Sequence, residues 1–118
     1  MINIDRNNIL NDKYSVASFV GIFHEQNEWN DEEYFKLENA LYEASLNCVN
    51  YPIPQELSWG VFKIFSYLML SFSCHTDPND GFEITNITDD QFYERRERVQ
   101  LVFEGFFSGE MPDKSILG

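Results

Sequence analysis

The sequence predicts an all-α fold, a compact bundle of about four main helices that forms a single domain over residues 1–118, and three observations lead to this prediction. Apolar residues recur at steps of three and four, which is the period of a helix buried along one face. Candidate N-caps, Asn30 and Thr88, precede acidic first turns. Aromatic residues make up 16% of the chain, so material for one core is abundant.

The first quarter of the chain predicts a helix with Asn11 or Asp12 as its N-cap. A helical stripe fits Val16, Phe19, Val20 and Phe23. An alternating, strand-like pattern partly fits the same segment, at Tyr14, Val16, Val20 and Ile22. We favour the helix.

A second helix is predicted to begin after Asn30, because Asp31, Glu32 and Glu33 would lie in its first turn, where the helix dipole favours acids. Its apolar stripe consists of Tyr34, Leu37, Leu41, Ala44 and Cys48. The segment 51–54, which holds two prolines, ends it.

A third helix is predicted with Pro54 in its first turn and an end near Cys74 and His75. One stripe contains Leu57, Val61, Ile64, Phe65, Leu68 and Phe72, and a second contains Phe62 and Met69. A helix that is apolar over most of its circumference belongs at the centre of a fold. The apolar run 61–72 is too short and too interrupted to predict a membrane span.

Residues 76–86 predict the main loop, because they contain Pro78 and an Asp-Gly pair. Thr88 and Gln91 resemble a capping box that starts a fourth helix. The buried stripe of that helix consists of Phe92, Val99, Phe103 and Phe106. Gly109 and Pro112 end the helix, and residues 113–118 are predicted to be a frayed tail.

No motif predicts catalysis, a cofactor or a metal. Cys48 and Cys74 are predicted to be reduced and buried, because the N-terminus resembles no export signal. His24 lacks the second histidine that a zincin places four residues later, and His75 lacks the partners of a structural zinc site. We expect both histidines to be helix-end side chains that bind backbone groups.

Charge is the main functional signal. The formal net charge is -12, and no Lys or Arg occurs between Lys63 and Arg95. This balance excludes a nucleic-acid footprint and predicts a positively charged partner. We predict as binding residues the acidic loop surface, which we define as Asp77, Asp80, Glu83, Asp89 and Asp90.

A second acidic set is the alternative binding surface, and it consists of Glu25, Glu28, Asp31, Glu32 and Glu33. The helix dipole alone accounts for acids in a first turn, so the residues of either surface that begin helices need no partner. The loop carboxylates have no such role beyond turn formation. Solubility is the remaining explanation for them.

Three segments resemble a family of small bacterial immunity proteins of contact-dependent growth inhibition and related polymorphic toxin systems. They are residues 19–24 (FVGIFH), 74–83 (CHTDPNDGFE) and 102–112 (VFEGFFSGEMP). The resemblance implies a cytoplasmic protein that binds the C-terminal toxin domain of a large exported effector and blocks its active site. It implies no enzymatic activity and no cofactor.

Together, the acidity and the resemblance predict steric and electrostatic occlusion of a basic toxin. We expect a nuclease, with a ribonuclease as the narrower class, because an enzyme that grips phosphates presents Lys, Arg or His. We expect a monomer that forms a one-to-one complex, because no apolar stripe beyond the needs of the core is evident. The alternatives are an acidic DNA mimic, which would compete broadly with DNA, and a small hydrolase or metal enzyme.

Overall fold

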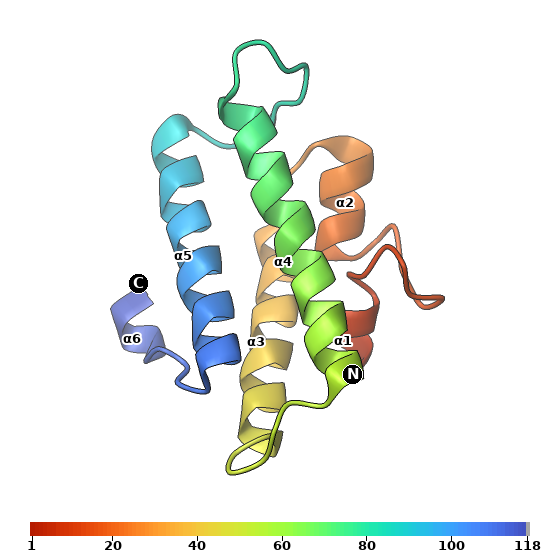
Figure 1. The fold of residues 1–118 in the computed structure, drawn as a ribbon. Helices are drawn as coiled ribbons and strands as arrows, with labels where there is room; N and C mark the ends of the chain where they lie inside the picture. Colours follow the sequence, from red (N-terminus) through yellow and green to blue (C-terminus); the bar gives the residue numbers. More distant parts are fainter. Residues whose placement is uncertain (118) are drawn as a thin grey trace.

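The computed structural model describes residues 1–117, and helices are the regular elements of that part of the chain. Their bounds are α1 Ile2–Asp5, α2 Phe19–Gln26, α3 Asp31–Asn47, α4 Gln55–Thr76, α5 Asp89–Ser108 and α6 Lys114–Leu117. The prediction of an all-α fold with four main helices is confirmed. Helix α3 contacts α1, α2 and α5, while α4 contacts α1 and α5 and lies in front of α3 in Figure 1.

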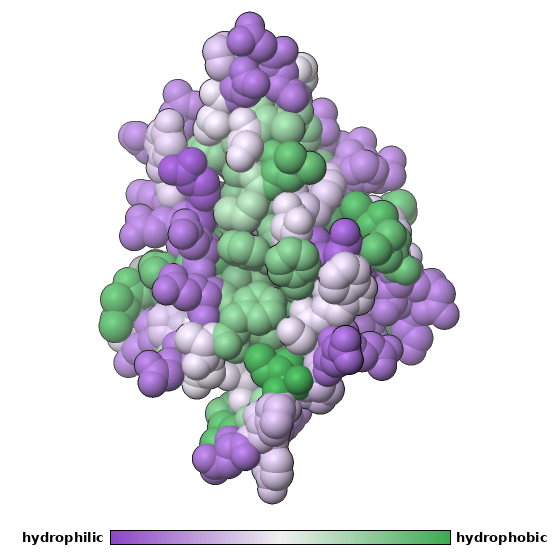
Figure 2. Space-filling view, viewed as in Figure 1, coloured by the Kyte–Doolittle hydropathy of each residue, from purple (hydrophilic) through white to green (hydrophobic). Residues whose placement is uncertain are grey.

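The surface has two different characters on the face that carries α4. Apolar side chains gather down the middle of Figure 2, over α4, and hydrophilic side chains cover the loop that follows α4 and the flanks of this face. The loop joins the end of α4 to the start of α5 at one end of the molecule (Figure 1). An apolar helix surface and an acidic loop therefore lie next to each other.

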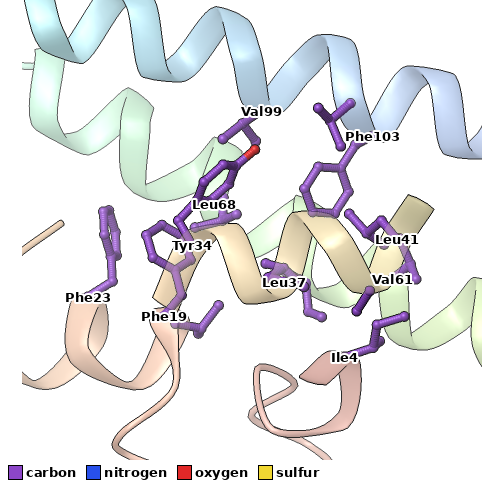
Figure 3. Packing of buried hydrophobic residues seen from close by; sticks show 14 of the residues in the cluster. Ile4, Phe19, Phe23, Tyr34, Leu37, Leu41, Val61, Leu68, Val99 and Phe103 are labelled. Atoms are coloured by element: carbon purple, nitrogen blue, oxygen red, sulfur yellow. The ribbon is translucent and has the colours of Figure 1, made fainter. Parts of the chain in front are cut away.

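The core lies between the four long helices. Leu37 and Leu41 of α3 face Phe103 of α5, and all three side chains are fully buried (Figure 3). Phe19 and Phe23 of α2 form an aromatic cluster with Tyr34 of α3 and Phe72 of α4 near the start of α3. Each such side chain contributes about 1.5–3 kcal/mol of transfer free energy when fully buried.

The predicted starts of α3 and α5 and the predicted end of α5 are confirmed, whereas α3 ends at Asn47, before the predicted stop at residues 51–54. The Asn30 side chain accepts a hydrogen bond from the backbone N–H of Glu33 (2.9 Å), and Thr88 and Gln91 form both bonds of a capping box. Gly109 ends α5 with a φ of 83°, in the left-handed region that glycine adopts without strain. Pro54 lies one residue outside its predicted place, at the N-cap of α4.

The predicted N-cap of the helix in the first quarter of the chain, which is α2 in the structure, is wrong. Helix α2 begins at Phe19, and Ser18 caps it by accepting a hydrogen bond from the N–H of Gly21 (3.0 Å). The preceding chain does not continue the helix but packs closely against it at Gly21. A Cβ at this position would lie 2.2 Å from the carbonyl oxygen of Ser15, so only glycine fits. Asn11 and Asp12 therefore lie in turns well before the helix.

Of the predicted tail, residues 114–117 form the short helix α6, and residue 118 lies outside the described residues. The tail is tied to the helices at two points. Tyr42 donates a hydrogen bond to the carbonyl of Pro112 (2.6 Å), and Arg98 donates one to the carbonyl of Leu117 (3.3 Å). The local sequence predicts neither hydrogen bond, because the partners lie far apart along the chain.

Helix α4 differs most from its predicted role. Val61, Leu68 and Phe72 are buried, but Phe62 of the second stripe is 48% exposed, while Met69 of that stripe is partly buried and packs against the core. The helix therefore lies at the side of the core. The helix has 22 residues and a mean hydropathy of 1.3 over its most apolar window. By length and composition alone, α4 is therefore long and apolar enough to cross a membrane, but the core helix of a soluble protein passes the same test, so the prediction that it is no membrane span is not contradicted.

Both cysteines are free, as predicted, but Cys48 and Cys74 are partly exposed and not fully buried. His75 accepts a hydrogen bond from the backbone N–H of Ile84 (3.0 Å), which confirms its predicted role. For His24 the predicted backbone partner is wrong, because Nδ1 is hydrogen-bonded to the hydroxyl of Tyr67 (2.9 Å).

Candidate binding surface

The acidic loop surface is built by the end of α4, the following loop and the start of α5. Two of its carboxylates organise the loop: the backbone N–H of Asn79 donates to Asp77 (2.9 Å), and that of Phe82 donates to Asp80 (2.9 Å). These are Asx turns, in which one carboxylate oxygen fixes the backbone. Both side chains remain exposed to solvent in these turns.

The loop is anchored to the rest of the molecule. Ile84 is buried, and Thr85 donates its backbone N–H to the carbonyl of Asn27 (2.9 Å). Asn86 forms two hydrogen bonds with the backbone of Trp29, one in each direction (2.8 and 2.9 Å). The loop therefore holds its acidic side chains in a set position beside the segment that joins α2 to α3.

The structure brings all five residues of the acidic loop surface to one end of the molecule. All five are exposed, and within residues 1–117 none of their carboxylates forms an ion pair. The Cys74 thiol beside them is affected by this charge: partial burial raises its pKa, and the carboxylates of Asp80 and Asp77 raise it further. The thiol is therefore a poor nucleophile.

The second acidic set is divided by the structure. Asp31 pairs with Arg95 (3.0 Å), and Glu33 pairs with Arg6 (3.3 Å) and Lys36 (2.8 Å). The hydrogen bond from Lys36 is the largest cause that lowers the pKa of Glu33, against an opposing effect of burial. These two carboxylates already have partners and stabilise the fold.

The remaining members, Glu25, Glu28 and Glu32, are exposed and lack ion pairs within the described chain. Glu28 stands between two residues, Asn27 and Trp29, whose backbone groups bind the loop after α4. The structure therefore adds Glu28 to the neighbourhood of the acidic loop surface.

A buried ion pair on α3 was absent from the sequence predictions. Glu38 is fully buried and accepts two hydrogen bonds from Arg98 (2.8 and 2.9 Å) and one from the Tyr34 hydroxyl (3.1 Å). Burial, with Glu38 as the next cause, raises the pKa of Tyr34, so this hydroxyl stays a donor. Glu38 lies four residues after Tyr34 on the buried stripe, and this spacing is the signal that could have revealed it.

A groove of about 530 Å³ runs beside this ion pair between α3 and α5. Asp31, Arg95 and Arg98 line it, together with Leu117 of α6. Asp31 is already bound by Arg95, and the other lining carboxylates, Glu94 and Glu97, are exposed on α5 with no histidine among the lining residues, so the groove does not pair an acid with a base for acid–base chemistry. Within residues 1–117 no group of three or more His, Cys, Asp or Glu side chains gathers where it could hold a metal ion.

Helix α4 exposes an apolar surface that we name the outer α4 face, and it consists of Trp59, Phe62, Lys63, Ser66 and Leu70. Trp59 is 57% exposed and Leu70 is 66% exposed. The expectation that the chain has no apolar stripe beyond its core is therefore wrong. The helical period places these residues on one side, but the same period fits a buried stripe, so the sequence did not separate the two cases.

Comparison with known proteins gives one match. Residues 6–109 match the model of a family described as Immunity protein 41, which covers most of the chain. No curated protein and no solved structure matches the chain significantly.

Proposed function

Because the chain belongs to the immunity protein 41 family, we propose that it binds a basic toxin domain in a one-to-one complex and blocks the toxin's active site with the acidic loop surface. An immunity protein neutralises a cognate toxin and is not itself an enzyme. We propose that this toxin is a nuclease, with a ribonuclease as the narrower class. Neutralisation would take place in the cytoplasm of the producing cell.

The proposal depends mainly on five exposed carboxylates at one end of the molecule that form no ion pair in the part of the chain that the structure describes. A nuclease cleft presents cationic groups to phosphates, and carboxylates on an inhibitor match those groups in the same way. The anchored loop already holds Asp77 and Asp80 in turns, so binding need not order them. Preorganisation of this kind lowers the entropy cost of association.

The expected kinetic signature is fast association that depends on salt. Complementary charge acts mainly on the association rate constant, whereas buried contacts set the dissociation rate constant. At about 0.15 M salt the screening length is about 8 Å, so only carboxylates close to the contact continue to attract the toxin. Salt dependence therefore reports which acids lie at the interface.

The test measures binding to the toxin domain encoded immediately upstream of the gene, at low and at moderate salt. The variant Asp80→Lys/Glu83→Lys should lower the association rate constant by about tenfold or more at low salt. The control Glu43→Lys/Glu104→Lys changes the net charge equally at exposed sites on α3 and α5. On α5, Glu104 lies about 22 Å from Asp89, well beyond the screening length at moderate salt.

Equal slowing by both variants would show that net charge acts, and it would remove the acidic loop surface as the contact. Binding without protection of RNA or DNA from the toxin would contradict the nuclease assignment. Competition with DNA for unrelated DNA-binding proteins would favour the DNA-mimic alternative instead. No binding by the wild-type protein at either salt concentration would contradict the proposal as a whole.

A further inference from the structure

The outer α4 face presents three exposed apolar side chains, those of Trp59, Phe62 and Leu70, with Lys63 and Ser66 between them, and a hollow lies beside it. The rings of Trp59 and Phe62 stack with centroids 6.1 Å apart, and the ammonium of Lys63 lies 5.6 Å from the centre of the Trp59 ring. Beside them, a hollow of about 230 Å³ is lined by Leu70 and Leu10, both 66% exposed. Tryptophan and tyrosine anchors beside a pocket are typical of the centre of a protein–protein contact.

The outer α4 face is also free of acids. Between Glu56 and Asp77 the sequence contains no Asp or Glu, although the whole chain contains 20. A stretch of 20 residues without a carboxylate is therefore exceptional in this protein. Lys63 is the one charged side chain of this face, and its ammonium lies over the Trp59 ring, so removing this helix surface from water would bury apolar area without leaving a carboxylate unpaired.

The charge of the molecule selects the occupant of this face. A second copy brings another net charge of -12, and an anionic membrane surface brings negative headgroups, so both are repelled. A basic protein is attracted by the same charge. Helix α4 runs directly into the acidic loop surface, because its C-cap is Asp77. The partner that suits the outer α4 face is therefore the cationic one that suits the loop.

We propose that the outer α4 face is the apolar half of the toxin-binding surface, with Trp59 as its anchor, and that its occupant is the toxin domain. This inference rests on the proposed function and extends it, because it requires the toxin to present an apolar patch bordered by Lys or Arg. Trp59 and Asp77 lie about 27 Å apart along α4. A standard interface of about 800 Å² per partner is roughly 30 Å across and spans both.

The two halves of the surface should affect different rate constants. Trp59→Ala should weaken binding by about 30-fold through faster dissociation, with an association rate constant that stays within about threefold. Leu46→Ser is the matched control for Leu70→Ser, because Leu46 is a 75% exposed leucine near the end of α3. Leu70→Ser should weaken binding and Leu46→Ser should not. Thermal unfolding of each variant checks that the fold is intact.

A second measurement places the toxin without relying on affinity. The chain contains two tryptophans, Trp59, which is exposed, and Trp29, which is 4% exposed, so 5-fluorotryptophan labelling gives two ¹⁹F resonances that Trp59→Phe assigns. Unlabelled toxin domain should shift the Trp59 resonance and leave the Trp29 resonance in place. A complex in which the Trp59 resonance does not move would overturn the inference.

The outcomes separate this inference from the proposed function. If the wild-type protein does not bind the toxin domain, the proposed function fails and the inference fails with it. If acid reversals slow association but Trp59→Ala and Leu70→Ser change neither rate constant, only the inference fails. A Trp59 resonance that moves on dilution of the protein alone indicates a second copy, and one that moves with phosphatidylcholine vesicles indicates a membrane; either result overturns the toxin as occupant.

Discussion

Two regions of this protein are rich in Asp and Glu but have different surroundings. At the start of α3, Asp31 and Glu33 are bound by three basic side chains. In the acidic loop surface, no carboxylate has an ion pair within residues 1–117. The comparison teaches that the position of the basic residues, and not the number of acids, decides which carboxylates remain available to a partner.

The difference arises from contacts that are distant along the chain. Arg6 and Arg95 stand 27 and 64 residues away from the α3 carboxylates that they bind. The loop after α4 lies inside the interval 63–95, which has no internal Lys or Arg, and within residues 1–117 no base from another element forms an ion pair with its carboxylates. The acids of α3 are therefore part of the fold, whereas those of the loop remain available for binding.

The largest expected effect is a loss of stability when a structural acid, Glu38, loses its partner. Arg98→Met removes the partner that donates two hydrogen bonds to the fully buried Glu38. Such a loss costs about 3–5 kcal/mol of unfolding free energy, because a buried carboxylate loses its compensating charge. Urea unfolding measures it. The double variant Glu38→Leu/Arg98→Met should recover much of the loss, and an Arg98→Met variant as stable as the wild type would contradict this role.

A smaller effect sharpens the contrast between paired and unpaired acids. Glu33→Gln should lower the free energy of unfolding by up to about 1 kcal/mol, since it removes two ion pairs at the surface. Glu83→Gln should leave stability unchanged or raise it slightly, because it relieves repulsion in a protein of net charge -12. Equal losses in urea unfolding would show that both acids are structural, and the comparison would fail.

The sequence predicts some features of the fold and of the candidate binding surface better than others. Helix starts at Asn30 and Thr88 depend on side chains within three residues, so local pattern is sufficient. The start of α2 depends on the chain folding back against Gly21, and α6 depends on Tyr42 and Arg98. These contacts are long-range, and no local pattern encodes them.

For the candidate site, the sequence predicts that the loop acids lie together, because they are close along the chain. It does not predict that Asp31 and Glu33 are already paired, since Arg6 and Arg95 come from other elements. It also does not separate the exposed Trp59 from a core aromatic, because both fit a helical stripe. Charge clustering alone therefore gives two candidate surfaces, and the fold distinguishes them.

The smallest expected effect is the pH dependence of the ion pairs of Glu33. The folded protein lowers the pKa of Glu33 below its ordinary value of 4.5, chiefly through the hydrogen bond from Lys36. A carboxyl group with a lowered folded-state pKa stabilises the protein above its unfolded-state pKa and loses that contribution as pH falls through its folded-state pKa. The stability difference between wild type and Glu33→Gln should therefore be constant between pH 7 and about pH 5.5 and should shrink below about pH 4.5. Urea unfolding over this pH range measures the difference.

The same pair of proteins in an Arg6→Met/Lys36→Met background is the control, because that background lacks both cations that lower the pKa of Glu33. A difference that persists unchanged at acid pH, or that narrows equally in the control background, would show that packing and not charge makes Glu33 structural.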